Sequence, residues 1–380
     1  MSNAILTRAI DALASRQDLS AEQTAEVLAE IMHGDVSEVQ IAGFLIALRT
    51  KGETVEELTG LARTMRDLAS HVASAREDLI DTAGTGGGRT SFNVSTTAAL
   101  IAAGAGCAVA KHGNRSATSK SGSADLLEAL GARIDLGPQA VAACIEEAGF
   151  GFMFAPAHHQ ATRFVVPVRH ELAVRTIFNL LGPLTNPAGA RRQLIGVSDV
   201  SYLERIAGAL ALLGVDRALV VAGEDGLDEV SASAPTTVAE INGDEIRHYV
   251  LTPGELGLES SGEAPAPPAP DGGTPEQNAA VTRAILRSAG DAGTGSGEAA
   301  GGSVGAQMTG APAPGEALAL ANAGAAIYVS GRVDSIAEGV SAARAALADG
   351  GAASALERYV QASHRHAPVR DAHHAQRGAS

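Results

Sequence analysis

Helical periodicity dominates the first seventy residues. Apolar side chains recur at helical spacing, for example at Val27, Leu28 and Ile31. Three hydroxyl residues precede such runs at capping-box spacing: Ser20 with Gln23, Ser37 with Gln40, and Thr54 with Glu57. The pattern predicts a small N-terminal all-helical domain over residues 1–70, which part of residues 170–195 is expected to join.

From about residue 78, short apolar runs alternate with helical patterns such as Ser123–Leu130 and Pro138–Glu147. Strand–helix alternation favours a larger α/β domain, over residues 78–363, with a mostly parallel central sheet and helices packed around it. The predicted strands are Leu79–Thr82, Cys107–Lys111, Gly151–Ala155, Gln193–Val197 and Ala218–Ala222. Two later runs, Thr236–Ile241 and Glu245–Leu251, flank Asn242-Gly243, a pair that predicts a tight antiparallel hairpin.

Two stretches, at about residues 260–273 and 289–315, consist mainly of Gly, Ala, Ser and Pro. They have little to bury, so they are expected to be disordered insertions, with a helix over Pro275–Arg287 between them. An apolar segment over Leu318–Tyr328 and a helix over Val333–Leu347 follow. Residues 364–380 contain several histidines and are predicted to form a flexible tail; a metal site there is the alternative.

The charge balance restricts the partners. The chain of 380 residues is 45% apolar and carries 28 basic against 43 acidic residues, a net charge of −15. Such a surface repels nucleic acid and anionic membranes. The two cysteines are too few for a disulfide framework. Since no apolar run approaches the roughly 18 residues that span a bilayer, and the first residues lack the apolar core of a signal peptide, we expect a cytoplasmic protein.

The first segment with recognisable chemistry follows the strand that ends near Thr82. Successive glycines from Gly84 to Gly88 allow backbone amides to approach an oxyanion, and a helix N-terminus at Asn93 supplies further N–H groups. The hydroxyls of Ser95 and Thr96 suit a phosphate or a magnesium ion. A flexible turn with a helix cap is the alternative interpretation.

The second segment runs from Lys111 to Gly131. Residues at the carboxyl end of a parallel strand face the crevice where α/β proteins bind ligands. Lys111 and Arg115 place cations there, beside the hydroxyls of Ser116, Thr118, Ser119 and Ser123. This combination suits a phosphate together with a pyrophosphate, although a solvated loop would have a similar composition.

Two further segments carry single candidate groups. Arg169 could bind a planar carboxylate through both ends of its guanidinium group, although a lone arginine often lies on the surface or caps a helix. Asp228 and Glu229 are adjacent carboxylates after a predicted strand. Magnesium usually takes one or two carboxylates plus substrate phosphates, whereas a solvated acidic pair is the alternative.

Taken together and in this order, these segments resemble the anthranilate phosphoribosyltransferases over about Thr7 to Val360. The most specific pieces are KHGNRSATSKSGSADLLEALG, PVRHELAVRTIFNLLGPLTNP and DGLDEVS. The resemblance implies a nucleoside phosphorylase-like fold, a homodimer formed through the helical domain, and magnesium as cofactor. It also implies transfer of the phosphoribosyl group from phosphoribosyl pyrophosphate (PRPP) to anthranilate, by orientation and electrostatics and without a covalent enzyme intermediate.

The resemblance also implies residue roles. Lys111, Asn114 and Arg169 would be catalytic, and Ser95, Asp228 and Glu229 would organise magnesium. Anthranilate would be bound by Gly84, His112, Asn114, His159, Arg169 and Pro183. PRPP would be bound by Gly84, Thr85, Gly86, Gly87, Ser91, Asn93, Val94, Ser95, Thr96, Lys111, Asn114, Arg115, Ser116, Ala117, Thr118, Ser119 and Ser123.

The chain departs from the family pattern at several places. Gly88 stands where the family usually has Asp, and the loop to Asn93 is one residue shorter, so we expect an altered magnesium optimum. His158, Gln160 and Ala222 replace the usual Tyr, Pro and His. Two alternatives remain: a pyrimidine nucleoside phosphorylase of the same fold, and a non-catalytic nucleic-acid-binding relative. The intact RTIFNLLGPLTNP segment and the acidic pair favour the PRPP enzyme, and the net charge disfavours nucleic acid.

Overall fold

The computed structural model describes residues 2–116, 119–258, 269–287, 313 and 315–368. Ala117 and Thr118, two expected PRPP contacts, lie outside this set, as does most of both low-complexity stretches. No helix in the described ranges is long and apolar enough to cross a membrane.

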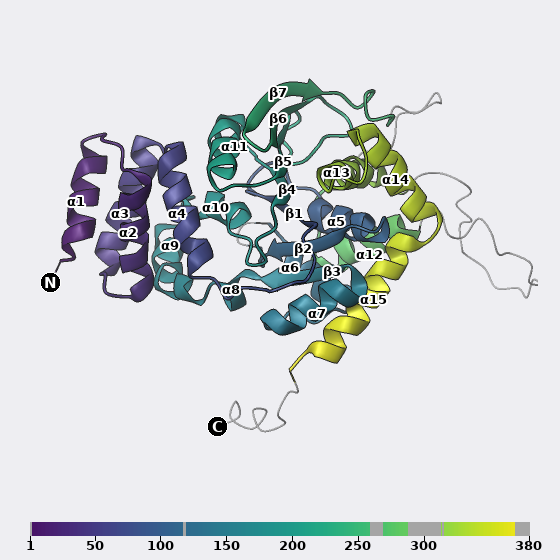
Figure 1. The fold of residues 1–380 in the computed structure, drawn as a ribbon, viewed down its shortest axis with the longest axis horizontal. Coiled ribbons are helices and arrows are strands. Elements are labelled where there is room, and N and C mark those ends of the chain that lie inside the picture. The colour runs from purple at the N-terminus through teal and green to yellow at the C-terminus, as the bar shows by residue number, and fades with distance from the viewer. Residues whose placement is uncertain (1, 117–118, 259–268, 288–312, 314, 369–380) are drawn as a thin grey trace, which may run out of the picture.

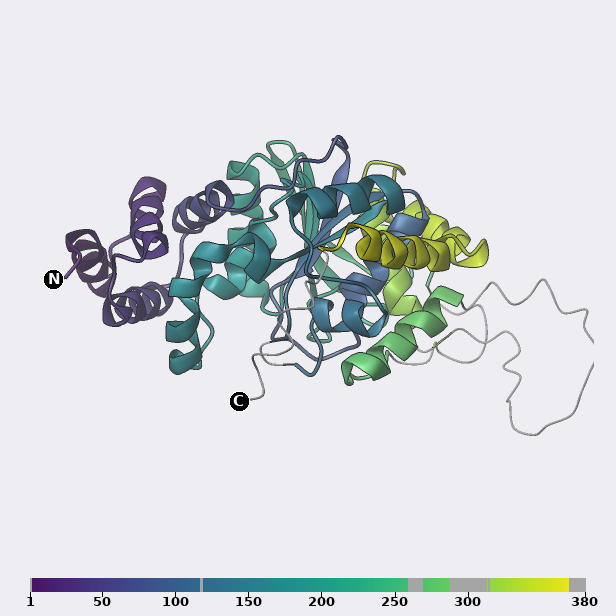
Figure 2. The same ribbon diagram turned by 90° about the horizontal axis from the view of Figure 1, so that it is seen from below.

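The N-terminal helices form a bundle at one end of the molecule (Figures 1 and 2). They are α1 (Ala4–Ala14), α2 (Ala21–His33), α3 (Glu38–Lys51) and α4 (Val55–Asp67). The capping boxes predicted at Ser20 and Thr54 are complete. The one at Ser37 is only half formed, because the Gln40 side chain bonds to both backbone groups of Asn3 instead.

The described residues form a seven-stranded sheet in the order β3-β2-β1-β4-β5-β6-β7. The first five strands of that order pair in parallel and the last two pairings are antiparallel, which confirms the predicted fold class. The tight turn between β6 and β7 contains Gly243 at φ +59°, as expected for the hairpin. The strands are β1 (Leu79–Gly84), β2 (Ala108–Gly113), β3 (Phe150–Phe154), β4 (Arg192–Gly196), β5 (Arg217–Gly223), β6 (Thr236–Asn242) and β7 (Glu245–Leu251).

Helices cover both faces of the sheet, so the strands are buried on two sides, as parallel sheets require. One hydrophobic core lies under α5 (Val94–Gly104), α7 (Pro138–Ala148), α12 (Pro275–Arg287), α13 (Glu316–Val329), α14 (Ile336–Ala348) and α15 (Gly351–His366). The second core joins the opposite face to α11 (Leu203–Leu212) and to the helical bundle. Both views show the bundle and α13–α15 on opposite sides of the sheet.

Shorter helices connect these layers. They are α6 (Ser123–Ala129), α8 (Ala155–His158), η1 (Gln160–Phe164), α9 (Val166–Leu172), α10 (Phe178–Leu181), η2 (Gly182–Leu184) and η3 (Val200–Tyr202). Val168 of α9 and Leu180 of α10 belong to the same core as the bundle helices. The segment around residues 166–184 therefore links the bundle to the sheet.

The C-terminal helix extends past the boundary expected at residue 363. α15 continues to His366, where the His366 ring lies 2.6 Å from a Glu147 carboxylate oxygen, and the His364 ring lies 2.9 Å from the Gly131 carbonyl. These anchors correct the predicted start of the tail; His373 and His374 lie outside the described residues. Within the described ranges, no group of three or more His, Cys, Asp or Glu side chains could hold a metal.

Candidate active site

The candidate site lies at the carboxyl ends of β1 and β4. The sheet order continues from β1 to β2 and β3 on one side, and from β4 to β5 on the other, so these two neighbours form the switch point where α/β folds bind ligands. Gly84 and Gly196 are paired at the strand ends. A Cβ atom at Gly84 would lie 2.7 Å from Asp228 Oδ2, and one at Gly196 would lie 1.7 Å from the Asp228 carbonyl oxygen. Only glycine at both positions lets Asp228 pack over the strand ends.

The glycine loop, residues 84–89, rests on the turn that carries Asp228. The Gly86 N–H donates to Asp228 Oδ2 at 2.9 Å, and the Arg89 N–H donates to the Gly226 carbonyl at 2.8 Å. Gly86 and Gly87 both have positive φ, at +62° and +86°, a conformation that glycine adopts without strain. The predicted glycine-rich turn thus brings backbone amides next to the acidic pair.

Gly88 is confined by the same turn. A Cβ atom at this position would lie 2.6 Å from the Gly226 carbonyl and 3.1 Å from the Ser198 Cβ. The shortened loop therefore has no room for a side chain at Gly88 unless it moves, which gives a physical reason for the missing carboxylate.

Lys111 extends from β2 toward Thr82 of β1 and Ser95 of α5. Its side chain is buried, and Nζ donates to the Thr82 carbonyl at 2.5 Å and to Ser95 Oγ at 3.3 Å. Burial lowers the pKa of Lys111, while the charges of Asp81 and Glu229 oppose that shift. Lys111 and Ser95, which the resemblance places around PRPP, are thus in contact in the structure.

The acidic pair is held in an unfavourable electrostatic setting. Burial raises the pKa of Asp228. Burial and the neighbouring charge of Asp228 raise the pKa of Glu229 well above its usual value, against the opposing effects of Lys111 and of the Ser95 N–H. Neither carboxylate forms an ion pair with a described residue. Two partly desolvated carboxylates and the Ser95 hydroxyl are hard oxygen donors, the set that magnesium prefers.

His112, the residue after Lys111 on β2, contacts His159, which follows α8. Their ring centroids are 5.1 Å apart, and both rings contact backbone carbonyls of the segment after α10: His112 Nδ1 lies 3.1 Å from Gly182 O and His159 Nε2 lies 3.0 Å from Thr185 O. The buried Pro183 lies in the same turn, and its carbonyl accepts from Gln193 Nε2 at 2.9 Å.

Both imidazoles are uncharged at neutral pH. Burial lowers the pKa of His112 to about 3 and that of His159 to about 4. His112 Nε2 is buried and has no hydrogen-bond partner among the described residues. This part of the site is therefore a neutral wall of polar rings, which suits an aromatic ligand better than a phosphate.

Arg169 supplies a cation without a carboxylate partner among the described residues. Its guanidinium carbon lies 5.5 Å from the centre of the Phe178 ring, and Nη2 is 3.5 Å from Asn179 Oδ1. Burial lowers the pKa of Arg169. A partly buried guanidinium that lacks a counterion is suited to bind the carboxylate of a ligand.

The loop after β2 is arranged differently from the expectation. Arg115 pairs with Asp125 at 2.7 Å and with Glu128 at 2.6 Å, so its guanidinium group is not free for a phosphate. Asn114 is exposed, and its side chain accepts the Arg115 N–H. In this structure Arg115 therefore does not supply the free phosphate-binding cation that the sequence suggested.

The hydroxyl residues of that loop bond mainly to one another. Ser116 Oγ lies 2.7 Å from Ser119 Oγ, and the Ser116 N–H donates to Asp125. Ser123 is the first residue of α6. Hydrogen bonds within the protein therefore already satisfy several polar groups of this loop.

Residues at the start of α5 divide into site and core. Asn93 bonds to Ser121 and Asn278, which places it between the loop before α6 and the start of α12, while the Ser91 hydroxyl bonds to the Phe92 carbonyl. Val94 belongs to the hydrophobic core and its N–H bonds to Phe92 O; Thr96 is fully buried and its hydroxyl has no described partner. The side chains of Val94 and Thr96 are thus buried in this structure, and their contact with PRPP stays a prediction.

Sequence reasoning did not single out Arg175 or Ser198. The Arg175 guanidinium donates to the carbonyls of Thr85 and Gly86, and Ser198 Oγ also donates to Gly86 O at 3.0 Å. Asp81 and Asn186 form a second missed pair, since Asn186 Nδ2 donates to Asp81 Oδ2 at 2.7 Å beneath the site. Arg175 stands six residues after Arg169 in one of the most distinctive segments, which was the available signal.

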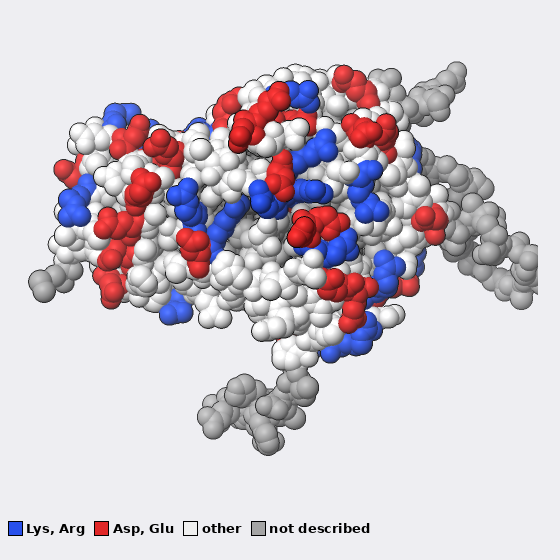
Figure 3. Space-filling view, viewed as in Figure 1, with Lys and Arg blue, Asp and Glu red and all other residues white. Residues whose placement is uncertain are grey.

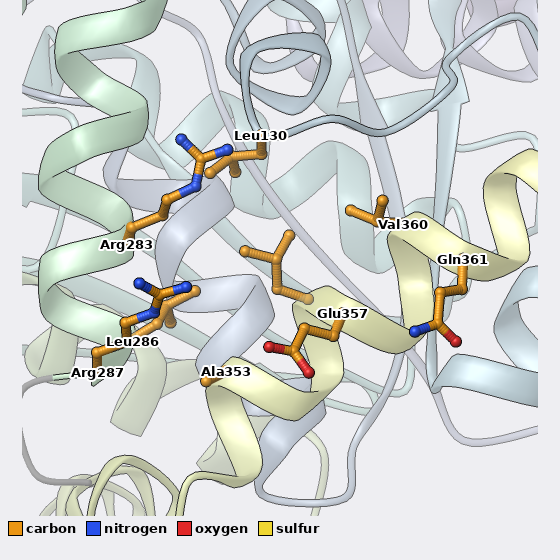
Figure 4. Close-up of a pocket in the computed structure, with 9 residues that line it drawn as sticks. Leu130, Arg283, Leu286, Arg287, Ala353, Glu357, Val360 and Gln361 are labelled. Carbon is orange, nitrogen blue, oxygen red and sulfur yellow. The ribbon is translucent and has the colours of Figure 1, made fainter. Parts of the chain in front are cut away.

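Surface charge agrees with this location. Figure 3 shows several Lys and Arg side chains close together in the middle of this face, with Asp and Glu side chains among them and over the surrounding surface. A separate pocket of about 220 Å³ lies between α12 and α15, where Arg283, Leu286 and Leu356 line it (Figure 4). None of the predicted site residues lines that pocket.

Comparison with known proteins agrees with this architecture. The helical bundle domain of a glycosyl transferase family matches residues 7–69, and the a/b domain of that family matches residues 76–353. Bundle, sheet and crevice thus define a two-domain glycosyl transferase. Within this class, the chain belongs to the anthranilate phosphoribosyltransferase family.

Three similar proteins illustrate the relationship. The anthranilate phosphoribosyltransferase of Rubrobacter xylanophilus is 48% identical over 362 residues, covering 95% of this chain and 98% of the relative. The crystal structure of the Thermus thermophilus enzyme aligns with a TM-score of 0.80 at 44% identity, covering 94% of this chain and 99% of the other. The Saccharomyces cerevisiae enzyme in complex with PRPP and Mg aligns with a TM-score of 0.79 at 26% identity, covering 96% and 99%.

Proposed function

We propose that the protein transfers the phosphoribosyl group of PRPP to the amine of anthranilate and releases pyrophosphate, a step of tryptophan biosynthesis. The observation that carries this proposal is the presence of two chemically different groups of residues in the candidate site, which we propose are two halves of one substrate crevice. One half combines the glycine loop, Lys111 and the pair Asp228–Glu229; the other combines neutral imidazoles with Arg169, which has no carboxylate partner among the described residues. The first suits a pyrophosphate and the second an aromatic carboxylate.

Magnesium fits the first half. Asp228, Glu229 and the Ser95 hydroxyl would hold it, and a divalent cation would offset the charge of Asp228 that, together with burial, raises the pKa of Glu229. When bound, the ion would neutralise charge on the pyrophosphate group. The yeast relative in complex with PRPP and Mg supports this assignment. We propose that the absence of a carboxylate at Gly88 alters the magnesium optimum.

The residues of the chain account for the remaining chemistry. Displacement of pyrophosphate from C1′ of the ribose places negative charge on the leaving group, and Lys111 with the amides of the glycine loop can stabilise that charge. The aromatic amine of anthranilate is neutral at pH 7, so no strong base is needed to create the nucleophile. Arg169 would hold the carboxylate and aim the amine at C1′, which makes orientation the main contribution of the second half.

Other expected site residues have supporting roles in the proposal. His112, His159 and Pro183 would line the anthranilate entrance, and Asn114 would contact both substrates. Around PRPP we propose Gly84, Thr85, Gly86, Gly87, Ser91, Asn93, Ser95 and the loop that contains Ser116, Ser119 and Ser123. Arg115 would have to exchange its ion pairs with Asp125 and Glu128 before it could bind a phosphate.

The assembly and location of the protein are also part of the proposal. We propose a homodimer formed through the helical bundle, because α3 exposes Val39 and Ile46, which are seven residues apart and so lie on one face of the helix. A cytoplasmic location agrees with the two buried cysteines, which are free thiols.

The function is tested by incubating the protein with PRPP, anthranilate and magnesium while following anthranilate fluorescence and released pyrophosphate. Loss of fluorescence with one pyrophosphate per anthranilate supports the proposal. A parallel incubation with thymidine and inorganic phosphate tests the phosphorylase alternative, and a gel shift with nucleic acid tests the binding alternative. Activity only in the thymidine reaction, or a shift without any turnover, would contradict the proposal.

A further inference from the structure

Arg175 donates two hydrogen bonds to the glycine loop. Its Nη1 atom donates to the Gly86 carbonyl at 2.6 Å, and Nη2 donates to the Thr85 carbonyl at 3.1 Å. The packing is close: a Cβ atom at Gly87 would lie 1.5 Å from Arg175 Nη1. A glycine at position 87 and an arginine at position 175 therefore fit together as a pair.

Peptide geometry gives these two bonds a consequence for the amides. In a trans peptide the C=O and the following N–H point in opposite directions. Arg175 draws the carbonyls of Thr85 and Gly86 toward itself and so turns the N–H groups of Gly86 and Gly87 away from it. The Gly86 N–H then donates to Asp228 Oδ2, on the candidate metal site, and the Gly87 N–H has no acceptor among the described residues.

The same arginine connects the two halves of the crevice. Arg175 lies on the segment that also carries Arg169, between α9 and α10. Its own carbonyl accepts from Arg49 Nη1 of α3 at 2.7 Å. Arg175 therefore joins the glycine loop and the helical bundle to the segment that carries Arg169.

We propose that Arg175 is a positioning residue for PRPP, which orients the amides of Gly86 and Gly87 toward the pyrophosphate group. This inference rests on the proposed function. The role requires hydrogen-bond donors to two carbonyls, whereas a direct phosphate ligand would require a positive charge. The two roles therefore respond differently to a neutral donor.

The test compares Arg175→Met, which keeps length but removes the donors, with Arg175→Gln, which keeps a neutral donor. Arg283→Ala serves as a matched control, because Arg283 also donates to a backbone carbonyl, that of Ala129 at the end of α6, and is not among the proposed substrate contacts. Binding of PRPP with magnesium is measured by calorimetry, alongside both KM values. Amide hydrogen exchange of the glycine loop is measured in the ligand-free protein.

We expect Arg175→Met to weaken PRPP binding by about ten- to a hundredfold, the range for lost charged-donor hydrogen bonds. The KM for anthranilate should change less, Arg175→Gln should recover part of the loss, and Arg283→Ala should behave as wild type. Exchange at Gly86, whose N–H donates to Asp228 Oδ2, should accelerate in Arg175→Met even without ligand.

Unchanged exchange in the ligand-free loop, or equal losses in Arg175→Gln and Arg175→Met, would overturn the positioning role in favour of direct charge recognition. Equal loss of affinity for both substrates with a lower melting temperature would also overturn it, in favour of a general structural role. Failure of the wild type itself to bind PRPP would instead refute the proposed function, and the inference with it.

Discussion

At the scale of the residue, burial disfavours the charged forms of Lys111 and Glu229 in the candidate site. Burial shifts the pKa of Lys111 downward and that of Glu229 upward, so each tends toward its neutral form, and each stabilises the charge of the other. Groups perturbed by burial and by a specific partner concentrate at functional sites. Backbone strain is a separate destabilising feature, and it occurs at Ala173, which ends α9 in the left-handed conformation at φ +51°.

Ala173→Gly should stabilise the protein. A left-handed residue after a helix favours glycine, because a Cβ atom is strained there. We expect the free energy of unfolding to rise by about 0.5–1 kcal/mol, after allowance for the greater entropy of glycine in the unfolded chain. Urea denaturation measures the change, and Ala173→Val, with a branched side chain, should destabilise. A destabilised glycine variant would show that Ala173 is not strained.

At the scale of elements, local sequence patterns were sufficient for the architecture. Alternating apolar runs identified the strands of the sheet, and Asn242-Gly243 identified the hairpin, because these signals depend on neighbouring residues only. The capping boxes at Ser20 and Thr54 could be predicted for the same reason, and both are complete in the structure. The glycine loop and the acidic pair each follow a predicted strand, and the structure brings them together at the carboxyl ends of the strands.

Long-range side-chain pairing could not be read in the same way. Arg115 looked like a phosphate ligand, but Glu128 on α6 binds it, thirteen residues further on. Arg175 contacts the glycine loop across about ninety residues of sequence, and Gln40 bonds to Asn3 instead of closing its own cap. Such choices depend on which partners the complete fold brings near, so periodicity and motif spacing do not determine them.

The contact between β2 and the turn after α10 should make stability depend on pH. His112 and His159 have lowered pKa values, about 3 and about 4, so the folded protein keeps them neutral while the unfolded chain takes up protons below about pH 6.5. Stability should therefore fall with pH from about 6.5 toward 4. At pH 5 each histidine should cost about 2 kcal/mol relative to pH 7.

Urea denaturation at pH 7 and pH 5 measures this dependence. His159→Gln should remove about half of the acid-induced loss attributed to the pair. His33→Gln, at the exposed end of α2, provides the control and should leave the loss unchanged. An equal loss in wild type and His159→Gln would show that the neutral pair does not control acid stability.

At the scale of the whole molecule, the helical bundle stands at one end, with its outer helices away from the sheet (Figures 1 and 2). Val39 on α3 is 81% exposed, and Ile46 is exposed on the same face. Apolar side chains aligned on an outer helix favour an interface between copies of the chain. The segment that carries Arg169 and Arg175 packs on this bundle, so the proposed dimer would adjoin the anthranilate half of the site.

Val39→Lys should weaken the proposed homodimer, because it places a charge in an apolar interface. Light scattering after size exclusion should show a dimer for wild type and a shift toward monomer for this variant. Val200→Lys, at another exposed valine outside the bundle, should remain dimeric. A monomeric wild type at micromolar concentration would contradict the proposed assembly.

The central claim is that one crevice holds a carboxylate-binding half and a pyrophosphate-binding half, and the most direct test is the anthranilate KM of Arg169→Ala. Arg163→Ala is the matched control, since Arg163 also lies over a phenyl ring in the same segment. Loss of a charge-assisted carboxylate contact should lower kcat/KM for anthranilate by about ten- to a hundredfold. The account predicts that the KM for PRPP stays near that of wild type. An unchanged anthranilate KM in Arg169→Ala, or an equal change for both substrates, would contradict it.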